Sequence, residues 1–138
     1  MVVFRSTVDR IEHLALVKGE VRGAGDILAR VHSINLFEDI IGERRNIVSR
    51  VMEKIAEAGC GVCVLVRNPR SDALVNRVRS LNAAPASHPL REYGIGAQIL
   101  MELGVSSIEL LSTHTLNVAA LKGYELRITR QVHMEMED

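Results

Sequence analysis

Residues 91–124 read REYGIGAQILMELGVSSIELLSTHTLNVAALKGY, the densest run of helix, strand and turn signals in the chain. The first half of this run keeps apolar residues at helical spacing and then reaches Gly104, which predicts a helix that ends there. The segment Val105 to Leu111 predicts a strand. Residues 117–122, closed by Gly123, predict a second short helix. The run therefore alternates helix, strand and helix, which is typical of an α/β domain.

Two strands rich in Val, Leu and Ile are predicted before this run, at residues 11–18 and 26–33. The segment Glu20-Val-Arg-Gly-Ala-Gly25 lies between them and is punctuated by glycine. Such a segment favours a turn, so the two strands are predicted to form a hairpin. Residues 35–45 show no clear period.

The middle of the chain predicts further helices and a central strand. Asn46 can cap a helix whose apolar stripe ends at Gly59. Residues 61–67, GVCVLVR, form a continuous apolar run, which indicates a strand buried on both faces. Another helix is predicted at residues 71–81, and the β-rich residues 124–133 predict a final strand.

The order of these elements indicates one α/β domain over residues 1–138, with a mixed β-sheet flanked by helices. Seventeen basic residues balance seventeen acidic ones, so no broad surface for nucleic acid is expected. No signal peptide is evident, and no apolar run approaches the roughly 20 residues that span a membrane. We therefore expect a cytoplasmic protein without a membrane partner.

Hydroxyl side chains gather in the predicted turn between the strand and the second short helix. Ser112, Thr113 and Thr115 lie where the free N–H groups of a helix N-terminus suit an anion. Arginine outnumbers lysine fourteen to three, and arginine suits bidentate recognition of phosphate. A GC-rich genome or a salt-bridged surface gives the same bias.

Cys60 and Cys63 spell C-x-x-C, which invites a zinc or redox interpretation. Residues three apart on a strand project to opposite faces, so the two sulfurs cannot easily close on one metal ion. The chain has no second cysteine pair, and its five histidines lack the i, i+4 spacing of metal ligands. We therefore expect no metal site, and we expect the cysteines to be packed in the core.

The amino-acid sequence resembles that of GTP cyclohydrolase II, the first enzyme of riboflavin synthesis. REYGIGAQIL followed by ELGV, ELL and AALKGY is similar to the carboxyl-terminal half of that family. EHLALVKGE and LARVHS extend the resemblance over nearly the entire chain. The resemblance implies a GTP cyclohydrolase II-like fold and a homodimer. Because the chain starts inside a strand-like pattern, we expect a fragment of a bifunctional protein in which 3,4-dihydroxy-2-butanone 4-phosphate synthase precedes this fold.

The zinc-binding segment of the family is altered. Its members hold zinc with three cysteines in a segment that resembles RVHSECLTGD followed by RCDCG, and the ion makes water nucleophilic for opening the imidazole ring of GTP. Residues 30–33 keep the opening RVHS, but Asn35 stands where the first cysteine belongs. After Arg45 the CDCG element is missing. The resemblance therefore implies that this chain has lost its zinc cofactor.

Other catalytic positions also depart from the family. The nucleotide loop RQEGR is shortened to Arg67-Asn68-Pro69-Arg70, and Leu81 stands where a catalytic tyrosine belongs. Pro89 replaces an aspartate. Arg91, in contrast, matches the arginine proposed to handle the α-phosphate. The resemblance implies that the fold is kept and that no catalytic residue remains.

Two functions stay open at this point. The first is a pseudoenzyme that serves dimerisation or regulates an attached synthase by binding a nucleotide, sugar phosphate or flavin. The second is an active hydrolase of GTP or a related nucleotide, either a metal-independent enzyme or a weak cyclohydrolase that borrows metal ligands from another chain. Its nucleophile would be Cys60, Cys63 or Ser112, but no base is evident. For the first function, the candidate ligand-binding residues are Arg67, Arg70, Arg91, Ser112, Thr113 and Thr115. The alternative interpretation is structural: the arginines would form surface ion pairs, and the hydroxyl residues would cap a helix.

Overall fold

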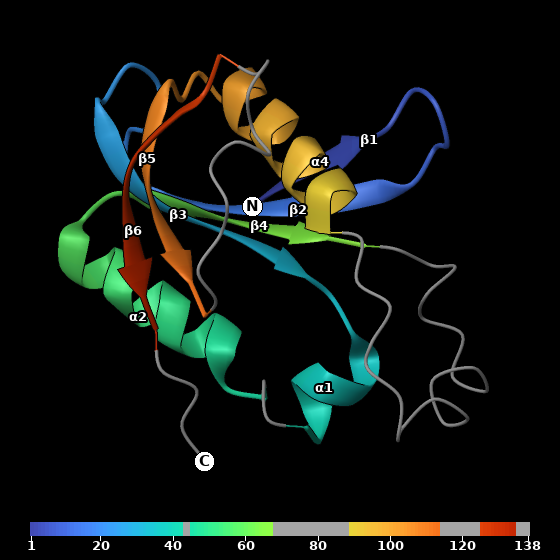
Figure 1. Cartoon of the computed structure of the whole chain (residues 1–138). Coiled ribbons are helices and arrows are strands. Elements are labelled where there is room, and N and C mark those ends of the chain that lie inside the picture. Colours follow the sequence, from blue (N-terminus) through green and yellow to red (C-terminus); the bar gives the residue numbers. More distant parts are fainter. Residues whose placement is uncertain (43–44, 68–88, 114–124, 135–138) are drawn as a thin grey trace.

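The structure, a computed structural model, describes residues 1–42, 45–67, 89–113 and 125–134 (Figure 1). Six strands form one mixed sheet in the order β1-β2-β4-β3-β5-β6. The predicted α/β architecture with a mixed sheet is therefore confirmed. The strands are β1 (Val2–Arg5), β2 (Glu12–Lys18), β3 (Asp26–Ser33), β4 (Gly61–Val66), β5 (Ser107–Ser112) and β6 (Arg127–His133), and the helices are α1 (Leu36–Ile40), α2 (Ile47–Ala58) and α4 (Pro89–Glu102).

Helices α2 and α4 cover opposite faces of the sheet (Figure 1). Val62, Val64 and Val66 of β4 belong to the apolar cluster that includes α4, whereas Cys63 lies in the cluster that includes α2. Because side chains alternate along a strand, one strand supplies both clusters. The prediction of a strand buried on both faces is confirmed, and β4 lies at the centre of the sheet.

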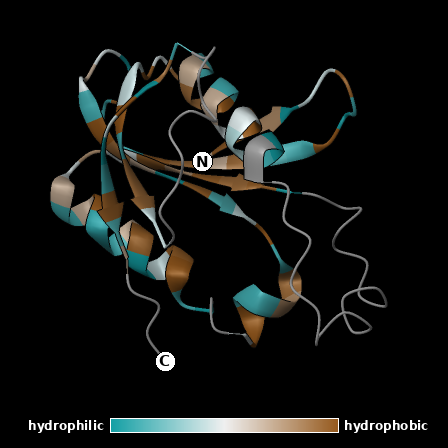
Figure 2. Cartoon of the chain, viewed as in Figure 1, coloured by the Kyte–Doolittle hydropathy of each residue, from teal (hydrophilic) through white to brown (hydrophobic). Residues whose placement is uncertain are grey.

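The core therefore has two layers, and Figure 2 shows hydrophobic colour concentrated on the central strands and on the inner sides of the helices. Each buried aliphatic side chain contributes on the order of 1.5–3 kcal/mol. The larger layer, on the α4 side, includes Val31, Val64, Ala97, Leu100 and Leu110, and the smaller layer, on the α2 side, includes Val51, Ile55, Cys63 and Leu111.

Helix α2 follows the predicted pattern. Ile47, Val51 and Ile55 are its buried residues and lie on one side. Gly59 adopts a left-handed conformation with φ of 85°, and its N–H group bonds to the Ile55 carbonyl oxygen at 2.9 Å. A residue with a side chain would be strained there, so glycine ends the helix. Asn46 holds the capping position, but its side chain makes no capping hydrogen bond.

Helix α4 confirms the prediction made from the REYGIGAQIL segment. It begins at Pro89, which suits the first turn of a helix because proline lacks an N–H group. Gly96 faces Val31 of β3, and a Cβ atom added at Gly96 would lie 2.5 Å from Val31 Cγ2. Glycine at this position therefore lets the helix approach the sheet closely.

The predicted hairpin of residues 11–18 and 26–33 is wrong. Strand β2 pairs antiparallel with β4, and β3 pairs parallel with the other side of β4, so β4 separates them. The continuous apolar run of β4 takes the central place because both of its faces can be covered there. The antiparallel neighbour of β2 is β1 instead.

The remaining predictions differ in outcome. Residues 35–45, which showed no period, contain the short helix α1. The helices predicted at 71–81 and 117–122 lie outside the described residues. In the described part of the chain, no helix combines the length and the apolar character needed to cross a membrane.

Candidate functional site

The candidate site lies where strands β3 and β4 end. These strands are parallel, so their carboxyl ends meet at one edge of the sheet. Ser33 ends β3, Arg67 directly follows β4, and the first turn of α4 contributes Arg91 and Glu92. Ligands of α/β proteins usually bind outside the carboxyl ends of parallel strands.

A small surface pocket is found at this edge. It is formed by the end of β4, the first turns of α4, the turn between β1 and β2, and the start of β2. Two arginines predicted as ligand residues, Arg67 and Arg91, therefore share one pocket although they are far apart in the sequence. The pocket is lined by Asp9, Ile11, His13, Val66, Arg67, Arg91, Glu92 and Ile95.

His13 forms a buried wall of this pocket, with only 3% of its surface exposed. Its Nδ1 atom accepts a hydrogen bond from the Arg67 backbone N–H at 3.0 Å. A neutral imidazole that accepts at Nδ1 carries its proton at Nε2. The Nε2 atom is buried and has no hydrogen-bond partner within the described ranges. Burial lowers the pKa of His13, which keeps the ring neutral.

The charged residues of the pocket contact the chain's own groups. Arg91 Nη2 donates to Asp9 Oδ2 at 3.1 Å, and about half of the Arg91 side chain remains exposed. Arg67 Nη1 donates to the Glu12 carbonyl oxygen at 3.4 Å. Glu92 Oε1 accepts from the Ser33 hydroxyl at 2.8 Å. Both guanidinium groups thus lie at the surface, where an anion can reach them.

The other candidate residues are placed differently. Ser112 was expected in a turn, but it is the last residue of β5, and its carbonyl oxygen accepts from the Met134 N–H at 2.8 Å. The strand extends one residue further because β6 pairs with it, and Ser112 is buried. Thr113 follows it and is partly exposed. Arg70 and Thr115 lie outside the described residues.

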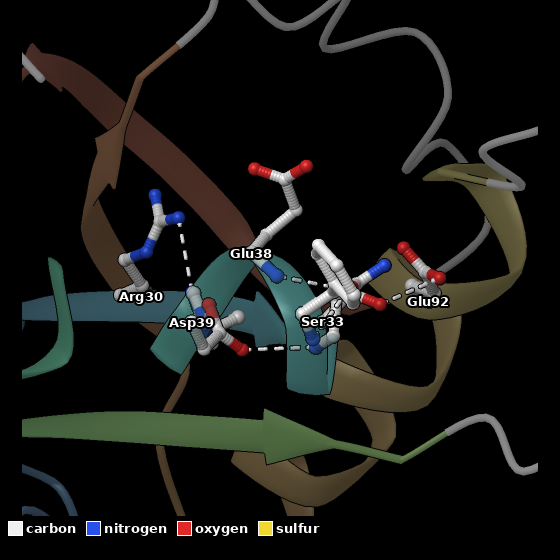
Figure 3. A network of polar contacts seen from close by, with 8 residues as sticks. Arg30, Ser33, Glu38, Asp39 and Glu92 are labelled. Atoms are coloured by element: carbon white, nitrogen blue, oxygen red, sulfur yellow. Dashed lines mark hydrogen bonds and ion pairs between the residues drawn. The ribbon is translucent and has the colours of Figure 1, made fainter. Parts of the chain in front are cut away.

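A polar network connects β3 to α1 and, through Ser33 and Glu92, to α4 (Figure 3). Arg30 is buried, and its Nη2 atom lies 3.2 Å from His32 Nδ1. His32 Nε2 lies 3.0 Å from Asp39 Oδ1. The other carboxylate oxygen, Asp39 Oδ2, accepts from the Asn35 backbone N–H at 2.9 Å. The RVHS segment, residues 30–33, therefore supports the start of α1 through the His32–Asp39 contact.

Asn35 occupies the position at which the resemblance implies the first zinc cysteine. Its Oδ1 atom accepts from the backbone N–H groups of Phe37 and Glu38, each at 3.1 Å. This is the hydrogen-bond pattern of a helix N-cap. The side chain therefore stabilises the start of α1 in place of the cysteine that the resemblance implies.

The two cysteines of the chain do not replace the missing ligands. Cys63 lies in the α2-side cluster, and Cys60 packs against the α4-side cluster. Burial raises the pKa of the Cys63 thiol to about 11, whereas zinc binding requires a thiolate. No group of three His, Cys, Asp or Glu suited to a metal ion occurs in the ranges that the structure describes. These residues do not fit the zinc site of the family.

The same observations bear on the alternative nucleophiles. The Cys60 thiol donates to the Glu20 carbonyl oxygen at 3.3 Å, and Cys63 is fully buried. Ser112 is 4% exposed and belongs to the sheet. None of the three presents a nucleophile to the pocket between Arg67 and Arg91.

Sequence reasoning missed Asp9, His13 and Glu92. Asp9 lies in the turn between β1 and β2 and carries no local signal for contact with Arg91, which is 82 residues away. His13 offered a signal, since it is a polar residue at an inward position beside the apolar centre of the strand. Glu92 directly follows Arg91, so its place at the pocket follows once the helix start is known.

Comparison with known proteins gives a consistent result. The model of the GTP cyclohydrolase II family matches residues 1–133. The monofunctional riboflavin biosynthesis protein RIBA 2, chloroplastic, of Arabidopsis thaliana is 39% identical over 140 residues, which cover 94% of this chain and 29% of that protein. The riboflavin biosynthesis protein RibBA of Bacillus mycoides (strain KBAB4) is 34% identical over 151 residues, which cover 96% of this chain and 38% of that protein.

A solved structure is also similar. RibBX, a two-domain 3,4-dihydroxy-2-butanone 4-phosphate synthase from A. baumannii, matches with a TM-score of 0.61 and 31% sequence identity. The match covers 94% of this chain and 35% of that one. The chain thus spans between about a quarter and two fifths of the length of these relatives.

Proposed function

The chain belongs to the GTP cyclohydrolase II family, and from this we propose that it is a catalytically inactive member that serves riboflavin biosynthesis. Its role is to regulate an attached 3,4-dihydroxy-2-butanone 4-phosphate synthase by binding a phosphorylated ligand, or to hold that synthase in a dimer. The placement of Arg67, Arg91 and His13 around one pocket carries this proposal.

The loss of ring-opening activity is supported by the α1 region. Ring opening in the family depends on zinc to activate water. Asn35 caps α1 with its side-chain oxygen, and the chain contains only two cysteines, both on or beside β4. A zinc site of the family type has no ligand set here, so no step of the reaction is assigned to this chain.

Retention of an anion site is supported by the chemistry of the pocket. Arg67 and Arg91 bring two positive charges to one edge of the sheet, and a guanidinium group matches the oxygens of a phosphate. His13 lines the same pocket, and its Nε2–H group is buried without a hydrogen-bond partner among the described residues. A nucleotide, a sugar phosphate or a flavin phosphate would each supply the required anionic group.

The proposed partner is a synthase domain. The similar RibBX protein is described as a two-domain 3,4-dihydroxy-2-butanone 4-phosphate synthase, and this chain covers 35% of it. By analogy, this chain works fused to, or associated with, such a synthase, as a homodimer in the cytoplasm. The regulated activity then resides in the partner domain and not in this one.

The test is isothermal titration of the metal-free chain with GTP, GMP, ribulose 5-phosphate and FMN. Arg91→Ala is the test variant, and Arg5→Ala is the matched control, because Arg5 is exposed and pairs with Glu12 outside the pocket lining. Removing a charge-assisted hydrogen bond should weaken binding about ten- to a hundredfold in Arg91→Ala. The control should bind like the unmodified chain.

Equal loss of affinity in both arginine variants would mean that binding follows overall charge rather than the pocket. The absence of binding by all four compounds would leave a dimerisation module without a ligand. Where a ligand binds, its effect on the synthase activity of the full-length protein then measures the regulatory role.

A further inference from the structure

The turn between β1 and β2 presents a carboxylate to the pocket in a fixed orientation. Ser6 holds this turn at its base, because its backbone N–H bonds to the Ile11 carbonyl oxygen at 2.9 Å and its carbonyl oxygen accepts from Arg10 N–H at 3.0 Å. Asp9 Oδ1 accepts from the Ile11 backbone N–H at 2.9 Å. One oxygen of the carboxylate is therefore committed to the turn itself.

The backbone of this turn contains a left-handed residue that is not glycine. Arg10 adopts a left-handed conformation with φ of 62°, and it is the non-glycine residue with positive φ among the described residues. Such a conformation persists where surrounding contacts hold it. The hydrogen bonds of the turn on both sides of Arg10 surround it here. The second oxygen of the neighbouring Asp9 carboxylate lies 3.1 Å from Arg91 Nη2.

Asp9 thus accepts from the Nη2 atom of Arg91, which is one of the donors that a bound phosphate would use. Carboxylate and phosphate oxygens compete for the same guanidinium donors because both accept charge-assisted hydrogen bonds from them. Asp9 and Glu92 also bring negative charge to the pocket, opposite to Arg67 and Arg91. Glu92 is held by the Ser33 hydroxyl, so Asp9 is the carboxylate whose displacement frees Arg91.

We propose that Asp9 is an internal competitor for the anion site, and that ligand binding requires its ion pair with Arg91 to open. This inference rests on the function proposed above, since it describes the regulation of the same pocket. The β1–β2 turn then acts as a latch. Movement of this turn, by a partner domain or by the ligand, would change the affinity for phosphate.

The test compares Asp9→Asn with the unmodified chain in titrations with GTP and with inorganic pyrophosphate. Asparagine keeps the oxygen that accepts from Ile11 N–H and removes the charge. Glu12→Gln is the matched control, because it removes the same charge from an exposed ion pair with Arg5 that lies outside the pocket lining. Asp9→Ser also keeps an acceptor for the turn and serves as a second variant if Asp9→Asn does not fold.

The expected result is about two- to tenfold tighter binding in Asp9→Asn, with no change in Glu12→Gln. The gain should disappear when Asp9→Asn is combined with Arg91→Ala. Binding that appears only in Asp9→Asn would also support the latch. Unchanged or weaker binding in Asp9→Asn, with clear binding by the unmodified chain, would overturn the latch and leave the proposed site intact. If neither protein binds either probe, the latch and the proposed site fall together.

Discussion

Two polar clusters lie near the carboxyl ends of the parallel strands, and they differ in what they can do. The cluster of Arg30, His32 and Asp39 connects β3 to α1 and uses its hydrogen bonds within the chain. The pocket between β4 and α4 instead contains Arg91, about half of whose side chain is exposed, beside the exposed Arg67. The first cluster supports the fold, and the second is the site at which we propose that a ligand binds.

The difference bears on the proposal that this member of the family keeps the fold without the ring-opening chemistry. Where the resemblance implies a metal ligand, Asn35 now caps a helix, which gives the segment a structural function. Arg67 and Arg91 instead lie at the surface and contact the chain at single donor atoms. We therefore expect substitutions in the two clusters to separate stability from binding.

The largest effect is expected for Asp39→Ala. This change removes the acceptor of the Asn35 N–H group and the partner of buried His32. Leaving these groups unpaired should lower the free energy of unfolding by about 2–3 kcal/mol, measured by urea denaturation. Asp39→Asn keeps one acceptor oxygen and should cost less. Equal stability of Asp39→Ala and the unmodified chain would show that the network is not structural.

A similar or smaller loss of stability is expected for Gly96→Ala, which tests how closely α4 must approach β3. The new Cβ atom would lie 2.5 Å from Val31 Cγ2 and would push the helix away. Overpacking of this kind costs about 1–3 kcal/mol. Val31→Ala in the same chain should recover part of the loss, because it removes the clashing methyl groups. Additive losses in the double variant would contradict this reading of the contact.

His13 should give a smaller and pH-dependent effect. Burial lowers its pKa below the ordinary histidine value of 6.5, so the unfolded chain takes up this proton at a higher pH than the folded chain. The free energy of unfolding should therefore fall as the pH decreases below about 6.5. His13→Asn keeps an acceptor for Arg67 N–H, should cost about 1 kcal/mol at neutral pH, and should flatten this decline. Parallel pH profiles of the two proteins would refute the assignment.

The smallest effect on stability is expected for Arg91→Ala. Its ion pair with Asp9 is exposed, and such pairs contribute about 0–1 kcal/mol. Thermal denaturation should show little change, although the phosphate affinity falls. A large loss of stability would place Arg91 with the structural cluster and remove the contrast between the two regions.

The elements with strong periodicity were predictable from the sequence. Helices α2 and α4 and strand β4 carry apolar patterns and glycine ends that determine them locally. The pairing of β2 and β3 was not predictable from their glycine-rich connection, because the insertion of β4 between them depends on contacts distant in sequence. Helix α1 was missed since its five residues are too few to show a period, although Asn35 and the acidic first turn gave a capping signal.

The site was predictable only in part. Arg67 and Arg91 were proposed from the family resemblance, and the fold places both at one pocket. Ser112 was assigned to a turn because its hydroxyl favoured one, but pairing with β6 extends the strand through it. Asp9 reaches Arg91 through the arrangement of the sheet alone, which no local pattern encodes.

The central claim, that this chain keeps the family fold without its ring-opening chemistry, is tested most directly by formate release from GTP. The assay uses the purified chain with added zinc and magnesium, beside an active GTP cyclohydrolase II as positive control, and the bound zinc is measured in the same samples. We predict no formate above the blank and no stoichiometric zinc. Formate released together with stoichiometric zinc would show that the chain is an active enzyme and would contradict the claim.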